Sequence, residues 1–282
     1  MALQREIWIE DIVGGLYADN SFASRSIDHS QFVNLLLVHV PNAGAAPAVV
    51  KNRSELPAAV KHRTDIDLTY TLAEFTTDPI HIPHAETVEL SYDKRASVLA
   101  QVKASLMQSV HDELLQKWAS AALHSTNSGA SIPNGIKDLV AAAQQRMNED
   151  DLPQHGRCLL LNAEAYTKLL KELTGSQGMA FLSTAKADRG TVGQLFGFDV
   201  YLRSQLPAIE KGNPYALFWQ EQCVSRALGS TELYENTGDA LWYGDIMSAL
   251  VRAGGSRIRS DKKGVEVLYT EKPAPAPAPS QG

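Results

Sequence analysis

One long helix is the clearest element that the pattern of apolar and polar positions predicts. Its apolar side chains recur at every fourth position: Val98, Val102, Leu106, Val110, Leu114, Trp118 and Ala122. No Gly or Pro interrupts residues 91–128, and Ser91 is placed to cap the first turn. A helix over residues 92–119 would be about 42 Å long. Because a repeat of four exceeds 3.6 residues per turn, the apolar stripe drifts, so we expect the two ends to contact different surfaces.

The residues before this helix have the pattern of extended structure. Residues 35–40 form an apolar run that predicts a strand, and a turn is predicted at residues 41–44. Apolar and polar residues alternate over residues 66–72, which predicts a second strand. Between them, residues 45–63 are small, basic and irregular. We therefore predict that residues 31–90 form a long two-stranded arm, which needs another surface to lie against because a lone hairpin is marginal in water.

The two ends of the chain have patterns of their own. Residues 1–30 begin with an apolar patch that includes Trp8 and Ile12 and then become polar. Such a short arm has no core, so we expect another surface to cover its apolar side chains. Residues 272–282 alternate Pro and Ala, which predicts a polyproline-type tail that does not fold.

Helices and buried strands alternate downstream of the long helix. We predict a helix over residues 132–147 with Asn134 as its cap, and a second helix over residues 163–173. Strands are predicted over residues 157–161, 198–202, 216–219 and 265–269. The glycine-rich residues 190–197 lack the GxxxxGK sequence of a phosphate loop and precede alternating residues, so we interpret them as a turn that leads into a strand.

The composition narrows the class of protein. The 282 residues are 44% hydrophobic and 21% charged, as in an ordinary globular protein, and could form one large or two smaller domains. A net charge of −6 argues against a dedicated nucleic-acid-binding protein. No apolar run approaches the roughly twenty residues of a membrane span, so no membrane partner is expected. Cys158 and Cys223 lie among apolar neighbours and are interpreted as buried structural thiols of a reducing compartment.

Candidate catalytic and metal-binding residues do not combine into a recognisable site. His81 and His84 are the closest pair of histidines, but Pro83 keeps them off one helix face, and no Cys or carboxylate cluster completes a ligand set. The HExxH and GxSxG motifs of hydrolases do not occur. His39 and His124 are interpreted as half-buried structural residues. We therefore expect no catalytic residue, no metal and no cofactor.

Several motifs, taken in chain order, resemble one family. After the apolar N-terminal arm, the extended arm and the long helix come three stretches: Cys158-Leu-Leu-Leu-Asn-Ala-Glu-Ala-Tyr166, Gly190-Thr-Val-Gly-Gln-Leu-Phe-Gly-Phe-Asp-Val-Tyr201 and Tyr243-Gly-Asp-Ile-Met-Ser-Ala-Leu-Val-Arg-Ala-Gly-Gly255. Over about residues 5–270, this order of elements resembles the major capsid proteins of tailed bacteriophages. Their α+β fold is named after the Hong Kong ninety-seven phage.

The resemblance implies a division of the chain into the parts of that fold. These are an N-terminal arm (1–30), an extended β-arm or E-loop (31–90), the spine helix of the peripheral domain (91–130), an axial domain (131–228), a peripheral return (229–249), closing axial strands (250–271) and the tail (272–282). In many relatives a further segment precedes the arm and is removed. We expect that maturation has removed it here or that a separate scaffolding protein does its work.

The resemblance also implies a function and a set of partners. The chain would be a coat protein, not an enzyme, and would assemble with itself into hexamers and pentamers of an icosahedral head. That head would be built in the host cytoplasm and would enclose double-stranded DNA, which the protein contacts without sequence specificity. A portal protein, a scaffolding protein and a decoration or cement protein would be further partners. The lysine–asparagine crosslinks of some relatives cannot be assigned to any Lys of this sequence.

Contacts between subunits are expected from the two arms. The candidate residues are two apolar side chains of the N-terminal arm and the basic side chains of the extended arm: Trp8, Ile12, Lys51, Arg53, Lys61 and Arg63. Acidic surfaces of neighbouring subunits are favoured as partners of the basic residues over nucleic acid. The stretch lacks the interleaved aromatic residues that stack on bases, and the chain as a whole is acidic.

Two other classes of protein stay open. An encapsulin-type bacterial nanocompartment shares the fold and suits the length, and it would be distinguished by a protein cargo with a docking tail. A soluble α/β enzyme with an unrecognised site is the other alternative. Clustered carboxylates with perturbed pKa values in a closed pocket would favour it.

Overall fold

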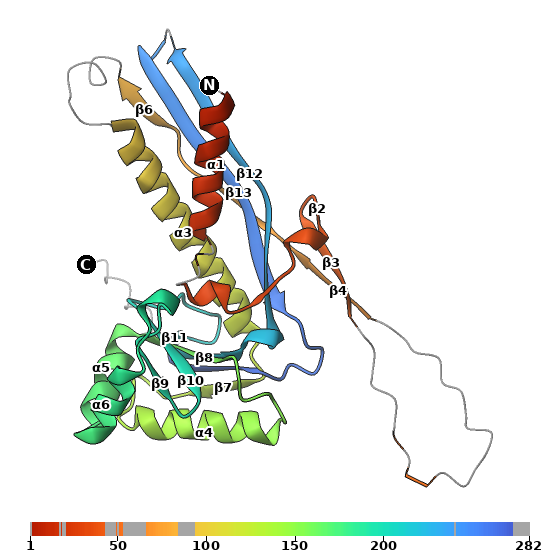
Figure 1. Cartoon of the computed structure of the whole chain (residues 1–282), viewed down its shortest axis with the longest axis vertical. Helices are drawn as coiled ribbons and strands as arrows, with labels where there is room; N and C mark the ends of the chain where they lie inside the picture. The colour runs from red at the N-terminus through yellow and green to blue at the C-terminus, as the bar shows by residue number, and fades with distance from the viewer. Residues whose placement is uncertain are drawn as a thin grey trace, which may run out of the picture.

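One long helix, α3 (Lys94–Ser120), runs through the molecule and joins its two main parts (Figure 1). Toward its N-terminal end, residues such as Leu106 belong to an apolar cluster with the strands of a long sheet. Toward its C-terminal end, residues such as Trp118 belong to a second cluster with a six-stranded sheet. The predicted helix is therefore confirmed, and so is the drift of its apolar stripe. The computed structural model describes residues 2–16, 18, 21–42, 49, 51–52, 66–83, 94–239 and 241–272, so the predicted cap Ser91 lies outside the described residues.

The lower part of the molecule in Figure 1 is a mixed six-stranded sheet in the order β7-β14-β11-β8-β10-β9. Its strands are β7 (His124–Asn127), β8 (Arg157–Asn162), β9 (Gly193–Leu195), β10 (Phe198–Arg203), β11 (Asn213–Gln220) and β14 (Val265–Thr270). The helices α4 (Ile136–Glu149), α5 (Ala163–Glu172) and α6 (Ser176–Ser183) bury an apolar core against one face, and the end of α3 packs on the other. The predicted strands in this part are confirmed, whereas β7 and α6 were not predicted.

The glycine-rich stretch contains a turn that leads into a strand, as predicted, but its residues Gly193–Leu195 themselves form strand β9, which was not predicted. Leu195 of β9 pairs with Phe198 of β10, and the two residues between them, Phe196 and Gly197, have φ angles of 48° and 80°. Two-residue hairpin turns favour such left-handed conformations because their twist matches that of the strands. The stretch therefore connects two paired strands of the sheet and forms no phosphate loop.

The start of α4 differs from the prediction. The helix begins at Ile136, two residues beyond the predicted cap Asn134, and its N-cap residue Gly135 has a φ of 88° and no side chain. The free backbone N–H groups are instead bound by the carboxylate of Glu172, at the end of α5. Its Oε1 accepts from Gly135 at 2.6 Å and from Ile136 at 3.1 Å, and Oε2 accepts from Lys137 at 2.9 Å. A cap from a distant helix therefore replaces the local cap.

The upper part is a long, twisted sheet in the order β1-β12-β13-β5, with β6 also paired to β13 (Figure 1). Its strands are β1 (Ile27–Asp28), β5 (Ala73–Thr76), β6 (Ile80–Pro83), β12 (Val224–Asp239) and β13 (Gly244–Arg257). The long hairpin of β12 and β13 was not predicted. At Gly255, β13 passes so close to α3 that an added Cβ would lie 2.3 Å from Leu114 Cδ1 and from the carbonyl oxygen of Ser225. Only glycine fits this crossing.

The arm leaves the molecule as a three-stranded sheet of β2 (Val33–Asn34), β3 (Leu37–Asn42) and β4 (Ile66–Thr71). The predicted pair of antiparallel strands is thus confirmed. The turn predicted at residues 41–44 is wrong in its first half, since Pro41 and Asn42 still pair with β4. Proline tolerates this position because its fixed φ is compatible with an extended strand. The strands β5 and β6, which fall inside the predicted arm 31–90, pair with β13 in the long sheet instead of extending the arm.

The N-terminal segment is a helix, α1 (Ala2–Leu16), which the apolar patch did not predict. It lies against α3 in Figure 1 and shares an apolar cluster with it. The segment that follows crosses to the six-stranded sheet, where the indole Nε1 of Trp219 donates to the carbonyl oxygen of Arg25 at 2.8 Å. Cys158 and Cys223 are both buried free thiols, as predicted. The domain boundaries drawn from the resemblance stay predictions.

Candidate assembly surfaces

The apolar residues of the N-terminal arm are covered by the chain itself. Ile12 and Leu16 are 0% and 1% exposed, and the half-buried Trp8 packs against the same cluster. His111 of α3 adds a polar contact, because its Nε2 lies 2.8 Å from the carbonyl oxygen of Leu16. The other surface that was expected to cover Ile12 is therefore α3 of the same chain. A contact of Trp8 or Ile12 with a neighbouring subunit stays a prediction.

The buried histidine at this junction is structural. Burial lowers the pKa of His111, and the nearby guanidinium of Arg203 acts in the same direction, although its hydrogen bond to Leu16 and the carboxylate of Asp112 oppose the shift. The ring also meets the edge of Phe22 at a centroid distance of 5.0 Å. A neutral imidazole in this place holds α1 to α3.

Two further histidines, His39 and His124, were predicted to be half-buried, and the structure confirms only one of them. His124 is half-buried, as predicted, and its Nε2 lies 3.8 Å from Asp150 Oδ2. His39 is exposed, so the prediction of a half-buried residue is wrong. The cause is the alternation of side chains along β3, which points Val38 inward and its neighbour outward.

The basic residues of the extended arm are described in part. Lys51 is exposed. Arg53, Lys61 and Arg63 lie outside the described residues. Their role as contacts to acidic surfaces of neighbouring subunits stays a prediction.

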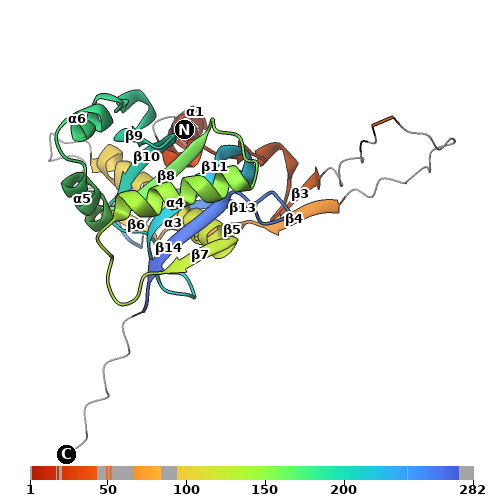
Figure 2. The same ribbon diagram turned by 90° about the horizontal axis from the view of Figure 1, so that it is seen from below.

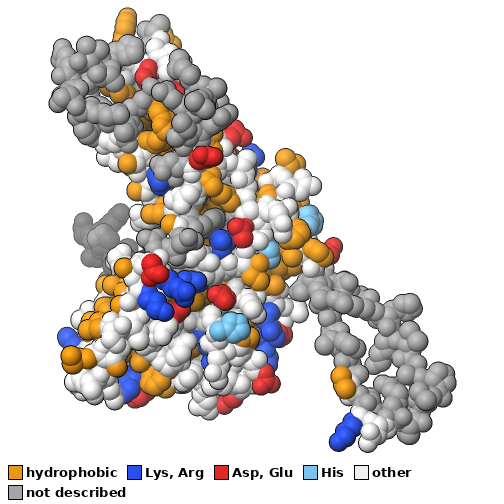
Figure 3. Space-filling view, viewed as in Figure 1, with side chains coloured by type: hydrophobic (Ala, Val, Ile, Leu, Met, Phe, Trp, Pro, Cys, Tyr) orange, Lys and Arg blue, Asp and Glu red, His pale blue; other side chains and the backbone are white. Residues whose placement is uncertain are grey.

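An exposed apolar turn at the root of the arm was missed in the sequence. Leu35 and Leu36, between β2 and β3, are 80% and 41% exposed, and Leu37, the first residue of β3, is 43% exposed. Figure 3 shows hydrophobic side chains gathered where the arm leaves the body of the molecule. Because residues 35–40 look like the interior of a strand, the pattern alone gave no sign of a turn. We name these three residues the leucine turn.

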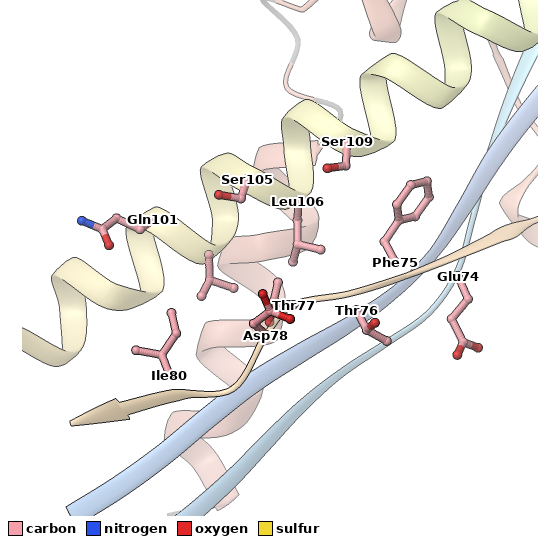
Figure 4. A pocket seen from close by; sticks show the side chains of 11 residues that line it. Glu74, Phe75, Thr76, Thr77, Asp78, Ile80, Gln101, Ser105, Leu106 and Ser109 are labelled. Atoms are coloured by element: carbon pink, nitrogen blue, oxygen red, sulfur yellow. The ribbon is translucent and has the colours of Figure 1, made fainter. Parts of the chain in front are cut away.

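A groove on the upper part of the molecule has a volume of about 530 Å³. It lies between α3 and the strands β5 and β6, and Figure 4 shows Phe75, Ile80 and Leu106 facing it. Ser105 and Ser109 of α3 form its polar wall. We name this hollow the spine groove.

The tip of the β12–β13 hairpin is a second exposed apolar surface. Leu241, Trp242 and Tyr243 are 85%, 59% and 81% exposed, at the end of the molecule farthest from the six-stranded sheet (Figure 1). Trp242 leans toward the ring of His81, with the centroids 6.0 Å apart. Exposed Trp and Tyr residues are typical of protein interfaces. Three consecutive large apolar residues just before Gly244 were a sign of this surface in the sequence.

The described residues offer little for catalysis. Burial raises the pKa of the Cys158 thiol, and it raises the pKa of Cys223 to about 11, so neither is a ready nucleophile. Among the residues that the structure describes, no three His, Cys, Asp or Glu side chains are grouped to hold a metal ion. None of the described helices is both long and apolar enough to cross a membrane.

The arrangement of a spine helix, a long hairpin sheet, a mixed-sheet unit and an extended arm defines the α+β fold of tailed-phage coat proteins, named after the Hong Kong ninety-seven phage. Neither a family model nor a curated protein matches the sequence. Solved structures do match. The capsid of Cyanophage P-SCSP1u aligns with a TM-score of 0.67 and 13% identity, over 88% of this chain and 87% of that chain.

Two further structures match over nearly their whole length. The capsid of Ralstonia phage GP4 aligns with a TM-score of 0.66 and 11% identity, over 91% of this chain and 90% of that chain. A virus-like particle from Pyrococcus furiosus aligns with a TM-score of 0.61 and 10% identity, over 94% of this chain and 99% of that chain. These likenesses confirm the fold that the motifs predicted. At such low identity they transfer no role to single residues.

Proposed function

We propose that this chain is the major capsid protein of a tailed phage and assembles with itself into a closed shell. The observation that carries the proposal is the extent of the match. About nine tenths of this chain aligns with about nine tenths of the phage capsid chains, so no large domain is left over for another activity. The role is structural, and the chain is not an enzyme.

The surfaces of the chain support self-assembly. The arm projects from the body, and the leucine turn and the hairpin tip expose large apolar side chains on separate parts of the molecule (Figure 1). Monomeric proteins rarely leave such contiguous apolar surfaces uncovered. Copies of the same chain, arranged as hexamers and pentamers, would cover them.

Further partners follow from the same proposal. A closed head of this kind encloses double-stranded DNA, which an acidic chain contacts at most weakly and without sequence specificity. A portal protein, a scaffolding protein and a decoration or cement protein would join the shell. The site of assembly would be the host cytoplasm, and the final location the virion capsid.

One alternative function is supported by a separate observation. The virus-like particle from Pyrococcus furiosus is matched over 99% of its chain, which favours a nanocompartment shell of the encapsulin type. Two of the phage capsids align with higher TM-scores, 0.67 and 0.66 against 0.61, and we prefer a phage capsid for that reason.

The size of the purified protein tests the proposal. Size-exclusion chromatography with light scattering should show capsomers or particles far above the 30.7 kDa of one chain. The contents of isolated particles separate the two shells, since a phage head holds nucleic acid and a nanocompartment holds a protein cargo. A stable monomer at high concentration, with the arm protected from proteases, would contradict both.

A further inference from the structure

A buried histidine lies where the root of the extended arm meets the long sheet. His29 directly follows β1 on the chain that leads into the arm, and it is only 5% exposed. Its backbone N–H donates to the carbonyl oxygen of Arg226 in β12 at 2.8 Å. This bond ties the start of the arm to the long sheet, near the place where β3 and β4 leave the body (Figure 1). The proposed function gives no role to a buried imidazole here.

The ring of His29 contacts both chains of the arm. It meets the edge of Phe32, on the chain that enters the arm, at a centroid distance of 6.0 Å. Its Nδ1 lies 3.4 Å from the hydroxyl oxygen of Tyr70 in β4, on the chain that returns. The same hydroxyl oxygen lies 3.3 Å from Oγ of Ser225, a fully buried residue of β12. We name these four residues the arm joint, because they link the two chains of the arm to the long sheet.

Few buried apolar side chains support the arm joint. The apolar cluster at this place has Val38, Leu72 and Ala227 as its buried members. The clusters on which α3 packs are far larger. A region with few buried apolar contacts opens at a small cost in free energy, compared with the core of the same protein. A change at one buried side chain can therefore shift the balance between a closed and an open joint.

The surroundings of His29 favour the neutral ring. Burial lowers its pKa, and the carboxylate of Asp28 opposes this shift only in part. The guanidinium Nη2 of Arg226 lies 3.6 Å from that carboxylate and weakens its attraction for a proton on the ring. Burial raises the pKa of Tyr70 to about 12, so the phenol that faces the ring stays neutral near pH 6. A protonated His29 in the closed joint would thus be a buried charge that is poorly compensated.

We infer that His29 is an acid-sensitive latch that holds the root of the arm on the long sheet. The neutral ring closes the arm joint. Protonation favours an open joint, in which β2, β3 and β4 separate from β12 and water reaches the ring. A base with a lowered pKa in the closed state favours that state fully above its ordinary value of about 6.5, and progressively less below it. The inference concerns a single subunit and does not depend on the proposed function.

Hydrogen exchange of unassembled full-length subunits measures the opening. The readout is the exchange of two amides that bond across the joint: that of His29, and that of Leu228, which donates to Ser30 Oγ at 2.9 Å. After correction for the intrinsic exchange rate, opening should increase several-fold from about pH 7.5 to about pH 5.5. About ten-fold is the ceiling for a histidine that titrates near 6.5 in the open state. Amides of β8 and β11, in the six-stranded sheet, should keep their protection.

Two histidine variants separate the latch from a general effect of acid. His29→Gln leaves a neutral polar side chain in the joint, so opening should change less than about two-fold between the two pH values. His39→Gln is the matched control, because His39 lies on β3 of the same arm but is exposed. This control should keep the pH dependence of the wild type. A pH dependence that persists in His29→Gln would overturn the inference.

Titration of the wild-type ring decides the matter if His29→Gln opens the joint at every pH. The Cε1–H resonance of His29, assigned by its absence from the spectrum of the variant, should titrate with a midpoint below 6.5. The exchange of the joint amides should level off at the pH of that midpoint. A midpoint at or above 6.5, or a wild-type joint that is equally closed at both pH values, would also overturn the inference.

Discussion

We expect the carboxylate of Glu172 to contribute more to the free energy of unfolding than its position near the surface suggests. It accepts three backbone N–H groups at the start of α4, from Gly135, Ile136 and Lys137. In Glu172→Gln, one oxygen becomes an amide nitrogen that faces an N–H group, so about one hydrogen bond of ~1 kcal/mol is lost. Removal of the charge from the helix N-terminus costs a further ~0.3–1 kcal/mol. We predict a loss of about 1.3–2 kcal/mol in the free energy of unfolding.

The pH dependence of this loss has a defined sign. Partial burial acts to raise the pKa of Glu172, but the backbone N–H groups and the charge of Lys137 outweigh it and lower the pKa. A carboxylate with a lowered pKa contributes fully above its unfolded-state value of about 4.3. Its contribution decreases as the pH falls and disappears below the folded-state pKa. The difference between variant and wild type should therefore be full at neutral pH and vanish in strong acid.

The assay is thermal unfolding of unassembled subunits at pH 7 and at pH values below 4. At pH 7 the variant should melt several degrees lower, at about 2–4 °C per kcal/mol. Hydrogen exchange should show faster exchange of the amides of residues 135–137. Glu164→Gln is the control, since Glu164 lies on the same helix, is 62% exposed and pairs only with Lys168 at i+4. Equal melting of Glu172→Gln and wild type at pH 7, or a difference that persists in strong acid, would refute the account of the cap.

Three further predictions concern a buried ion pair, a close crossing and the basic arm. Arg146→Ala should cost about 3–5 kcal/mol in chemical denaturation, because it leaves the 2%-exposed Glu266 without its guanidinium partner; a loss under 1 kcal/mol would contradict this. Gly255→Ala should cost about 1–3 kcal/mol through overpacking against α3, and an unchanged melting temperature would show that β13 can shift. Arg53→Glu with Arg63→Glu should leave the circular dichroism spectrum unchanged and reduce the yield of shells, whereas a normal yield would show that these residues only keep the arm soluble.

Elements fixed by local patterns were predicted well from the sequence. Apolar residues at every fourth position predicted α3, and the apolar run around Cys158 predicted β8. The glycine-rich stretch predicted the turn between β9 and β10. In each case, the residues that determine the element lie next to one another in the chain. The order of these elements was enough to indicate the fold.

Elements fixed by distant partners were not predicted. The β12–β13 hairpin shifts register between Leu228 and Thr231, and such a bulge breaks the alternation by which a strand is recognised. Glu172 lies at the end of α5, where a negative charge interacts unfavourably with the helix dipole. Its role as the cap of α4 could therefore not be predicted from its neighbours in the sequence. The leucine turn lacks the Asn or Gly that marks a turn. The candidate contact residues of the extended arm were chosen by charge. The leucine turn was missed because only its place in the fold exposes it, whereas the hairpin tip had a sign in the sequence that was not used.

Electron microscopy of the purified protein is the most direct test of the central claim that this chain builds a closed shell. The account predicts hollow particles of uniform size, made of hexameric and pentameric rings, into which the described fold fits with α3 and the long hairpin as rigid bodies. Monodisperse single subunits, or open sheets and filaments without pentamers, would contradict it.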